Sequence, residues 1–399
     1  MLHSTSHRRY SRVGQIGFYS IRQVVIMASN ALIALAVIHR TSPANWGMFV
    51  KVLILVSIIG HVANWGNRDF LLRQFSTYPS KIASSFYSSL AARSMILMPA
   101  IVVLWYCDFE VGWLWVSMWL ILYFIYQSFD VIIVYHRRFR WATAVEVIGL
   151  LIILLPIIFR FEIPSTYSII KLYTASYLIR CTLLAILVRW PSGVPKSIEG
   201  SFAYFRQSFP FFIIGFSGLL QSKIDLYTIS FFLGESQIGT YQILMGFLLA
   251  IQAASAFLLT PFAKNIMRVP DKTVRKLSNS SIRLGLILVV VGIFCTRFIL
   301  DSLYHIELDL TYYLIGAAFA LPPFFYLSQI YQLYGHGKEK VVVWLNLVGA
   351  GLNMVLTILL IKGLGMLGAL IATALVQWGL LISYLLLCNN LRSNGDKVP

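Results

Sequence analysis

The chain has 399 residues, of which 58% are hydrophobic and 12% are charged, and its formal net charge is +17. Soluble domains carry about 25% charged residues, so this composition excludes an ordinary soluble domain. The excess of Lys and Arg would suggest nucleic acid in a soluble protein, but no polar segment offers a basic recognition helix, and we expect no nucleic-acid partner. Basic loops beside an anionic membrane surface account for the charge instead.

Apolar residues recur in blocks of about 17–25, which is long enough for a helix to cross about 30 Å of hydrocarbon. Lipid offers the backbone no hydrogen-bond partners, so such blocks form α-helices. We therefore predict an all-α, polytopic membrane protein with about twelve transmembrane helices. In chain order these spans are expected at 16–38, 45–65, 84–106, 111–135, 142–159, 166–188, 209–233, 238–260, 281–299, 309–333, 341–361 and 367–388.

Basic residues in the predicted loops give the spans an orientation. On one side the loops hold only Arg40, Arg160, Arg297 and Lys362, whereas all other loop lysines and arginines fall on the opposite side. Cytoplasmic loops are the ones enriched in Lys and Arg, so the richer side is cytoplasmic. With an even number of spans, both termini are then predicted to lie in the cytoplasm.

The middle of the chain predicts a division into two halves. The segment 189–208 contains Pro191 and Pro195 and falls on the cytoplasmic side. We expect it to be a linker between an N-terminal six-helix bundle, 1–188, and a C-terminal six-helix bundle, 209–399.

Basic residues inside the spans are the first candidates for function, because a charge at the centre of a membrane helix costs about 2.5–3.5 kcal/mol. Arg22 and Lys51 lie about six residues into their spans, where a long side chain can also reach the interface. Arg180 and Lys223 lie deeper. These four residues are the candidates for a cationic path through the membrane.

Acidic residues inside the spans fall into two groups. Asp225 shares a helix face with Gln221 and Thr228, which favours contact with water or a cation; a buried ion pair is the alternative. Lys223 cannot be its partner on the same helix, because positions i and i+2 point about 200° apart. Asp130 and Glu146 lie near cytoplasmic span ends, where pairing with the nearby Arg137, Arg138 or Arg140 is favoured at least as much as a role in transport.

Uncharged polar residues also occur within the spans. Each could line a polar cavity or form a hydrogen bond between helices, which is worth about 0.6–2 kcal/mol in a membrane. The candidates for the cavity lining are Asn30, Gln221, Gln252, Asn346 and Asn353.

The chemistry that the sequence lacks narrows the function further. There is no P-loop, no GxSxG and no HExxH pattern, so neither direct use of ATP nor a hydrolytic enzyme is expected. The cysteines Cys107, Cys181, Cys295 and Cys388 are scattered and suggest neither a metal site nor a disulfide. We predict a protein that is not an enzyme and has no cofactor, apart from a coupling H+ or Na+.

Three patches resemble the polysaccharide-export branch of the multidrug/oligosaccharidyl-lipid/polysaccharide (MOP) superfamily, the O-antigen (Wzx-type) flippases. The first runs from Lys223 and Asp225 to Tyr241, similar to that family's seventh span and the start of the eighth. The second, from Asn346 to Thr373, looks like its last two spans. The third runs from Gly47 to Arg73. The span pattern covers the whole chain, although its loops are short for the family.

The resemblance implies two six-helix bundles in a V shape around a central cavity. It implies the flipping of an undecaprenyl-pyrophosphate-linked oligosaccharide from the cytoplasmic to the periplasmic leaflet of the bacterial inner membrane, by alternating access, for surface polysaccharide such as O-antigen, capsule or exopolysaccharide. Membrane lipids, a polysaccharide polymerase and chain-length machinery are the expected partners. Arg22, Lys51, Arg180 and Lys223 would face the pyrophosphate, and Asp225 would bind the coupling cation.

Two alternatives stay open. A cation-coupled exporter of drugs or other small molecules would have the same fold, although such exporters are expected to favour acidic cavities. A polysaccharide polymerase or ligase is the enzyme alternative, but these enzymes usually place catalysis in a large periplasmic loop, and no predicted outer loop is long enough.

Overall fold

The computed structural model describes residues 3–106, 112–159, 165–188, 201–259, 271–335 and 337–395. Arg160 and most of the predicted linker, 189–200, lie outside these residues. Every regular element in the described part of the chain is a helix, and ten of these helices are long and apolar enough to cross a membrane. The predicted all-α, polytopic membrane fold is therefore confirmed.

The chain divides into two compact units, Met1–Phe216 and Ser217–Pro399. One helix, α8 (Ser201–Ile229), continues from the first unit into the second, and its first residues, 201–208, are part of the segment predicted as a linker. The predicted division at 189–208 itself stays a prediction.

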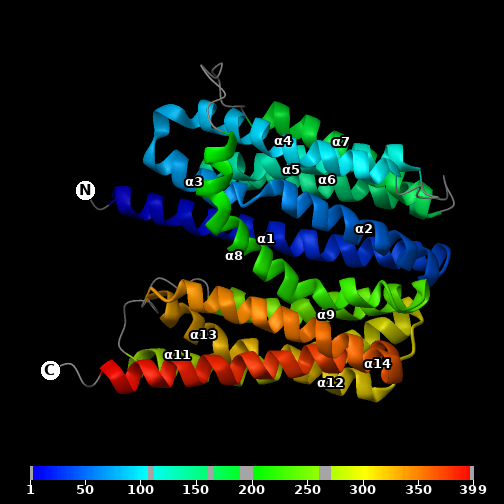
Figure 1. Ribbon diagram of the computed structural model, residues 1–399, viewed down its shortest axis with the longest axis vertical. Coiled ribbons are helices and arrows are strands. Elements are labelled where there is room, and N and C mark those ends of the chain that lie inside the picture. The colour runs from blue at the N-terminus through cyan, green and yellow to red at the C-terminus, as the bar shows by residue number, and fades with distance from the viewer. Residues whose placement is uncertain are drawn as a thin grey trace. The chain divides into compact units, whose positions relative to one another are not determined.

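The described residues of unit 1 form seven helices before α8, and Figure 1 shows most of them running side by side. The helices correspond to the first six predicted spans, with one additional short helix, α3, after the second. They are α1 (His3–Arg40), α2 (Pro43–Asn64), α3 (Asn67–Thr77), α4 (Ile82–Tyr106), α5 (Trp113–Tyr135), α6 (Phe139–Ile158) and α7 (Thr166–Leu187), and a 3-10 turn (Pro79–Lys81) precedes α4.

Unit 2 contains the end of α8 and the helices of the second half. Its elements are α9 (Glu235–Leu259), α11 (Asp271–Ile299), a π-helical turn η3 (Leu300–Tyr304), α12 (Leu310–Ala320), α13 (Pro323–Gly335) and α14 (Glu339–Gly395). The span predicted at 309–333 is split into α12 and α13 at Pro322, because Pro322 and the following Pro323 have no backbone N–H group with which to continue the helical hydrogen bonds.

The last two predicted spans are both parts of α14. They meet at Gly365, whose backbone (φ 56°, ψ −135°) is not helical. Glycine adopts positive φ without steric cost, so one residue makes the break that the sequence predicted as a short loop. The two parts of α14 pack closely just after this break, because a Cβ atom on Gly368 would lie 2.5 Å from the carbonyl oxygen of Leu360.

Trp65 and Gly66 end α2 and turn the chain into α3, both with positive φ (42° and 65°). A Cβ atom on Gly66 would lie 2.5 Å from the backbone nitrogen of Phe212 in α8. The Trp65 ring stacks on that of Phe212, with centroids 4.2 Å apart and planes 7° apart. The turn therefore fixes the first half of α8 to unit 1.

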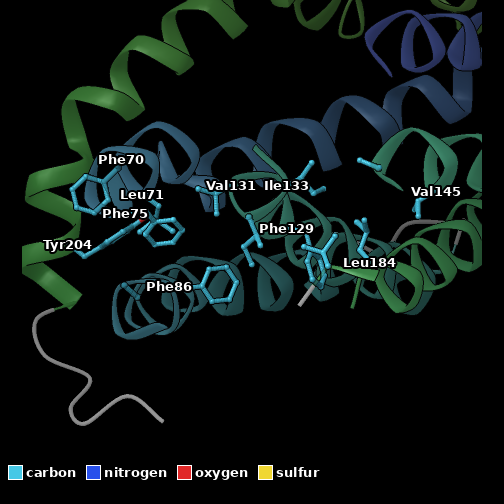
Figure 2. Close-up of a cluster of buried hydrophobic side chains, with 14 residues drawn as sticks. Phe70, Leu71, Phe75, Phe86, Phe129, Val131, Ile133, Val145, Leu184 and Tyr204 are labelled. Atoms are coloured by element: carbon cyan, nitrogen blue, oxygen red, sulfur yellow. The ribbon is translucent and has the colours of Figure 1, made fainter. Parts of the chain in front are cut away.

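A cluster of buried hydrophobic side chains holds this end of unit 1 together (Figure 2). Phe70, Leu71 and Phe75 from α3 meet Phe86 from α4 and Tyr204 from α8, and residues of α5, α6 and α7 extend the cluster. Phe70 contacts the edge of the Tyr204 ring at 5.3 Å. The short helix α3 is thus part of the core.

Candidate functional site

A cluster of ionised side chains lies inside unit 1. We call it the charge cluster; its members are Arg22 of α1, Arg68 of α3, Asp130 of α5, Glu146 of α6 and Arg180 of α7. The Arg22 guanidinium lies 2.7 Å from Asp130 Oδ1 and 3.3 Å from Glu146 Oε1. Arg180 Nη1 lies 3.1 Å from Glu146 Oε2, and Arg68 Nε lies 3.3 Å from Asp130 Oδ2. Five helices meet at this cluster.

Neighbouring side chains fix Arg22 and Arg180, the two buried arginines of the charge cluster, in place. The Tyr126 hydroxyl donates a hydrogen bond to Glu146 and accepts one from Arg22 Nη2 at 3.1 Å. The Arg180 guanidinium lies 5.1 Å from the centroid of the Tyr177 ring. A Cβ atom on Gly149 would lie 1.8 Å from Arg180 Nε, so the absence of a side chain at this position makes room for the arginine.

The carboxylate partners differ from the sequence prediction. Asp130 and Glu146 were expected to pair with Arg137, Arg138 or Arg140, which are close in sequence, but they pair with Arg22, Arg68 and Arg180 from other helices. Arg22 is 5% exposed, so its head group is held in the cluster and does not reach out to the interface. The helices bring Arg22 and Arg180, two of the four predicted cations, onto one carboxylate.

The Glu146 carboxylate is shared by two buried guanidinium groups, those of Arg22 and Arg180. In addition, the buried Arg180 Nε has no hydrogen-bond acceptor in the described part of the chain. Buried donors are nearly always paired, so a buried guanidinium group with an unused donor is suited to an anion.

Asp225 is the centre of a second polar group, in unit 2. It is 1% exposed, and its Oδ2 atom accepts a hydrogen bond from Tyr241 Oη at 2.5 Å and lies 3.4 Å from Thr373 Oγ1. Thr373 Oγ1 also lies 3.3 Å from Asn353 Oδ1 and 2.9 Å from the Ala369 carbonyl oxygen. We call Asp225, Tyr241, Asn353 and Thr373 the Asp225 group.

The Asp225 group has more acceptors than protons to share. The Thr373 hydroxyl has one proton but three acceptor oxygens around it, from Asp225, Asn353 and Ala369. Within the described residues no basic side chain forms a salt bridge with Asp225. Lys223, two residues earlier, attracts the Asp225 carboxylate electrostatically. Carboxylate, hydroxyl and amide oxygens gathered in this way are ligands that hard cations prefer.

A small pocket lies beside the Asp225 group and shares Thr373 with it. The pocket has a volume of about 170 Å³, and Gln221 and Gln252, two of the predicted lining residues, form part of its wall. Gln377 and Tyr326 add further polar groups. We call it the glutamine pocket.

The other predicted residues have separate surroundings. Asn346 accepts a hydrogen bond from Tyr384, 3.1 Å away, which joins the two parts of α14. Asn30 is exposed, and Lys51 and Lys223 are partly exposed on α2 and α8. Asn353 forms hydrogen bonds within the Asp225 group, as interhelical bonding would require.

One buried cation was absent from the predicted site. Arg93 of α4 is fully buried, and it donates to Ser89, Asn64 and Ser128 at 3.2, 3.2 and 2.9 Å. Its guanidinium also lies 4.8 Å from the centroid of the Phe124 ring. Its position well inside the predicted span 84–106 was the available signal. Because neutral hydroxyl and amide groups surround it, Arg93 joins α2, α4 and α5 structurally.

Comparison with known proteins shows which solved structure has a similar fold. Among solved structures, the chain is similar to the lipid II flippase MurJ in an inward closed conformation, with a TM-score of 0.69 and 14% sequence identity over 94% of this chain and 87% of that one. This chain has the MurJ fold. No protein-family model matches it, and no curated protein sequence is significantly similar. The predicted fold is therefore confirmed, while membership of the MOP superfamily and of its O-antigen (Wzx-type) branch stays a proposal.

The charge cluster predicts an unequal response to the loss of two carboxylates. Glu146→Gln should destabilise the detergent-purified protein by about 3–5 kcal/mol, because two buried guanidinium groups lose their shared partner. Asp301→Asn is the matched control, since Asp301 forms a 3.5 Å pair with Arg297 in which both side chains are well exposed. The control should cost no more than about 1 kcal/mol. Thermal unfolding of both variants measures the difference, and equal losses would contradict the structural role of Glu146.

Proposed function

We propose that this protein flips an undecaprenyl-pyrophosphate-linked oligosaccharide from the cytoplasmic to the periplasmic leaflet of the bacterial inner membrane, for surface polysaccharide such as O-antigen, capsule or exopolysaccharide. The proposal is supported by the MurJ fold over 94% of the chain together with the charge cluster. The protein would be a transporter and not an enzyme, with the membrane lipids, a polymerase and chain-length machinery as partners.

The charge cluster carries the chemical part of this proposal. A pyrophosphate that crosses the membrane needs cationic groups away from bulk water, and the buried guanidinium groups of Arg22 and Arg180 would supply them. Arg180 is the best placed to bind it, because its Nε atom has an unused donor. Arginine binds phosphate oxygens through paired N–H groups, so one phosphoryl group could use both Nε and Nη of Arg180.

The Asp225 group would bind the coupling cation, H+ or Na+. Because Asp225 and Thr373 come from α8 and α14, a cation bound between their oxygens would join these two helices and favour one conformation of unit 2. Alternating access then follows if the cation binds one conformation more tightly than the other. A cation-coupled exporter of small molecules remains the alternative, with the same Asp225 group and another cargo.

Deletion of the gene in its host tests the function. The deletion strain should lose surface polysaccharide and accumulate lipid-linked oligosaccharide in the cytoplasmic leaflet, as measured by carbohydrate analysis and by extraction of membrane lipids. Wild-type protein should restore export, whereas Arg180→Gln should reduce it by about 10–100-fold, since a phosphate-binding charge is lost. Arg297→Gln is the control for loss of an exposed arginine, and immunoblots must show equal amounts of all variants. Unchanged surface polysaccharide in the deletion strain would refute the flippase function.

The cation is tested in proteoliposomes. Wild-type transport of the lipid-linked oligosaccharide should respond to an imposed Na+ gradient or an imposed pH gradient, and the effective ion is thereby identified. Asp225→Asn should weaken this response by about 10–100-fold and Thr373→Val by about tenfold, because each removes an oxygen ligand or its orientation. Asp301→Asn should retain it. A normal response in Asp225→Asn would remove this residue from ion binding.

We also propose that both termini lie in the cytoplasm, as the loop charges indicate. Green fluorescent protein fused at residue 399 should be fluorescent, whereas alkaline phosphatase fused there should be inactive. The same reporters inserted in the predicted outer loop near Glu307 should give the opposite pair of results. Active phosphatase at residue 399 would show that the proposed orientation is inverted.

A further inference from the structure

The glutamine pocket differs from the charge cluster in the kind of ligand that it can hold. Residues from α8, α9, α12, α13 and α14 form its wall, and none of these residues is charged. Its volume is about 170 Å³. A buried anion needs a cationic partner, so this pocket is unsuited to a pyrophosphate.

Hydrogen bonds within the wall fix what two of the glutamines present. Gln252 Nε2 donates to the Phe319 carbonyl oxygen at 2.8 Å, which leaves Gln252 Oε1 as an acceptor. Gln377 Oε1 accepts from Tyr326 Oη at 2.9 Å, which leaves the amide N–H groups of Gln377 as donors. The two glutamines are thus oriented oppositely, and Gln221 adds a third amide to the same wall.

A ligand for this wall needs both donors and acceptors but no charge. Hydroxyl groups meet this requirement, because each one donates one proton and accepts at two lone pairs. The Phe319 and Tyr326 side chains supply apolar surface beside the amides, as the C–H faces of a sugar ring would need. Polar groups in fixed positions beside aromatic surface are a usual means of specific small-ligand recognition.

We propose that the glutamine pocket binds one neutral sugar residue of the cargo. This inference rests on the proposed flippase function and adds to it a division of chemistry: the charge cluster of unit 1 recognises pyrophosphate, and unit 2 recognises sugar. Thr373 lines the pocket and also contacts Asp225, so a bound sugar hydroxyl and a bound cation would share one side chain.

The experiment compares two ligands that differ only in the sugar. The probes are undecaprenyl pyrophosphate with the oligosaccharide, extracted from the deletion strain, and undecaprenyl pyrophosphate without sugar. Affinities of the full-length protein in detergent are measured by native mass spectrometry or thermophoresis. The wild type should bind the glycosylated carrier more tightly than the bare carrier.

Two kinds of variant remove the pocket's function. Gln252→Leu and Gln377→Leu each delete hydrogen bonds and should weaken binding of the glycosylated carrier about tenfold, without changing the affinity for the bare carrier. Gly218→Leu narrows the pocket without deleting a polar group; a Cβ atom there meets no atom within 4 Å, so the fold should tolerate it. Gly246→Leu is the matched control, because Gly246 is equally open but lies outside the pocket wall.

Each outcome decides a different question. Loss of the sugar-dependent difference in the glutamine variants and in Gly218→Leu, but not in Gly246→Leu, supports the proposal. Retention of the difference in Gly218→Leu and in both glutamine variants overturns it. Equal wild-type affinity for the two carriers overturns it as well, while leaving the flippase function intact. Binding of neither carrier contradicts the proposed function itself.

A further outcome concerns the cation. If the pocket variants discriminate between the two carriers normally but lose the transport response to Na+ or H+, the pocket is a path for the cation, and the proposal is overturned.

Discussion

Ionised groups buried inside a membrane-spanning unit are the constraint on which the rest of unit 1 depends. Glu146 forms ion pairs with two arginines, one from α1 and one from α7. Loss of either ion pair would leave a buried charge without its partner in apolar surroundings. Other choices in the sequence follow from this demand. Gly149 has no side chain because Arg180 occupies that space, and Tyr126 fills the remaining hydrogen-bonding positions between Glu146 and Arg22. The first, fifth, sixth and seventh helices are thereby bound to one another through polar contacts that lipid cannot replace.

The two units use polarity differently. Unit 1 concentrates full charges in its cluster, whereas the polar centre of unit 2 consists of one carboxylate, hydroxyl groups and amides. Electrostatic attraction is strong but poorly selective, because any anion of suitable size is attracted. Neutral hydrogen bonds discriminate between ligands by geometry. A donor or acceptor that gives up its hydrogen bond to water and finds no partner in the site lowers the affinity. A carrier with a pyrophosphate and a sugar presents both kinds of chemistry on one molecule.

The sequence predicts local features well and long-range partners poorly. The spans were found because hydropathy is a property of contiguous residues, and Gly365 falls in the gap between the predicted spans 341–361 and 367–388. The partners of Asp130 and Glu146 were wrong because Arg137, Arg138 and Arg140 are near in sequence, whereas the arginines that bind them come from helices far along the chain. Arg93 was not predicted as a site residue; its hydrogen-bond partners are uncharged side chains of α2, α4 and α5. The wall of the glutamine pocket combines five helices, and no periodic pattern in one span reveals that Gln252 and Gln377 face the same space.

The turn at Trp65 and Gly66 has a consequence for how the chain can be divided. Since the Trp65 ring stacks on Phe212, and the backbone of α8 passes where any side chain on Gly66 would lie, unit 1 includes residues that come after the midpoint of the sequence. The same helix goes on to carry Asp225 into unit 2. If the protein were produced as two co-expressed fragments cut at residue 200, Trp65 would therefore lie on a different fragment from Phe212, its stacking partner. The two halves share one structural member, and neither is a complete module that can be exchanged between proteins without it.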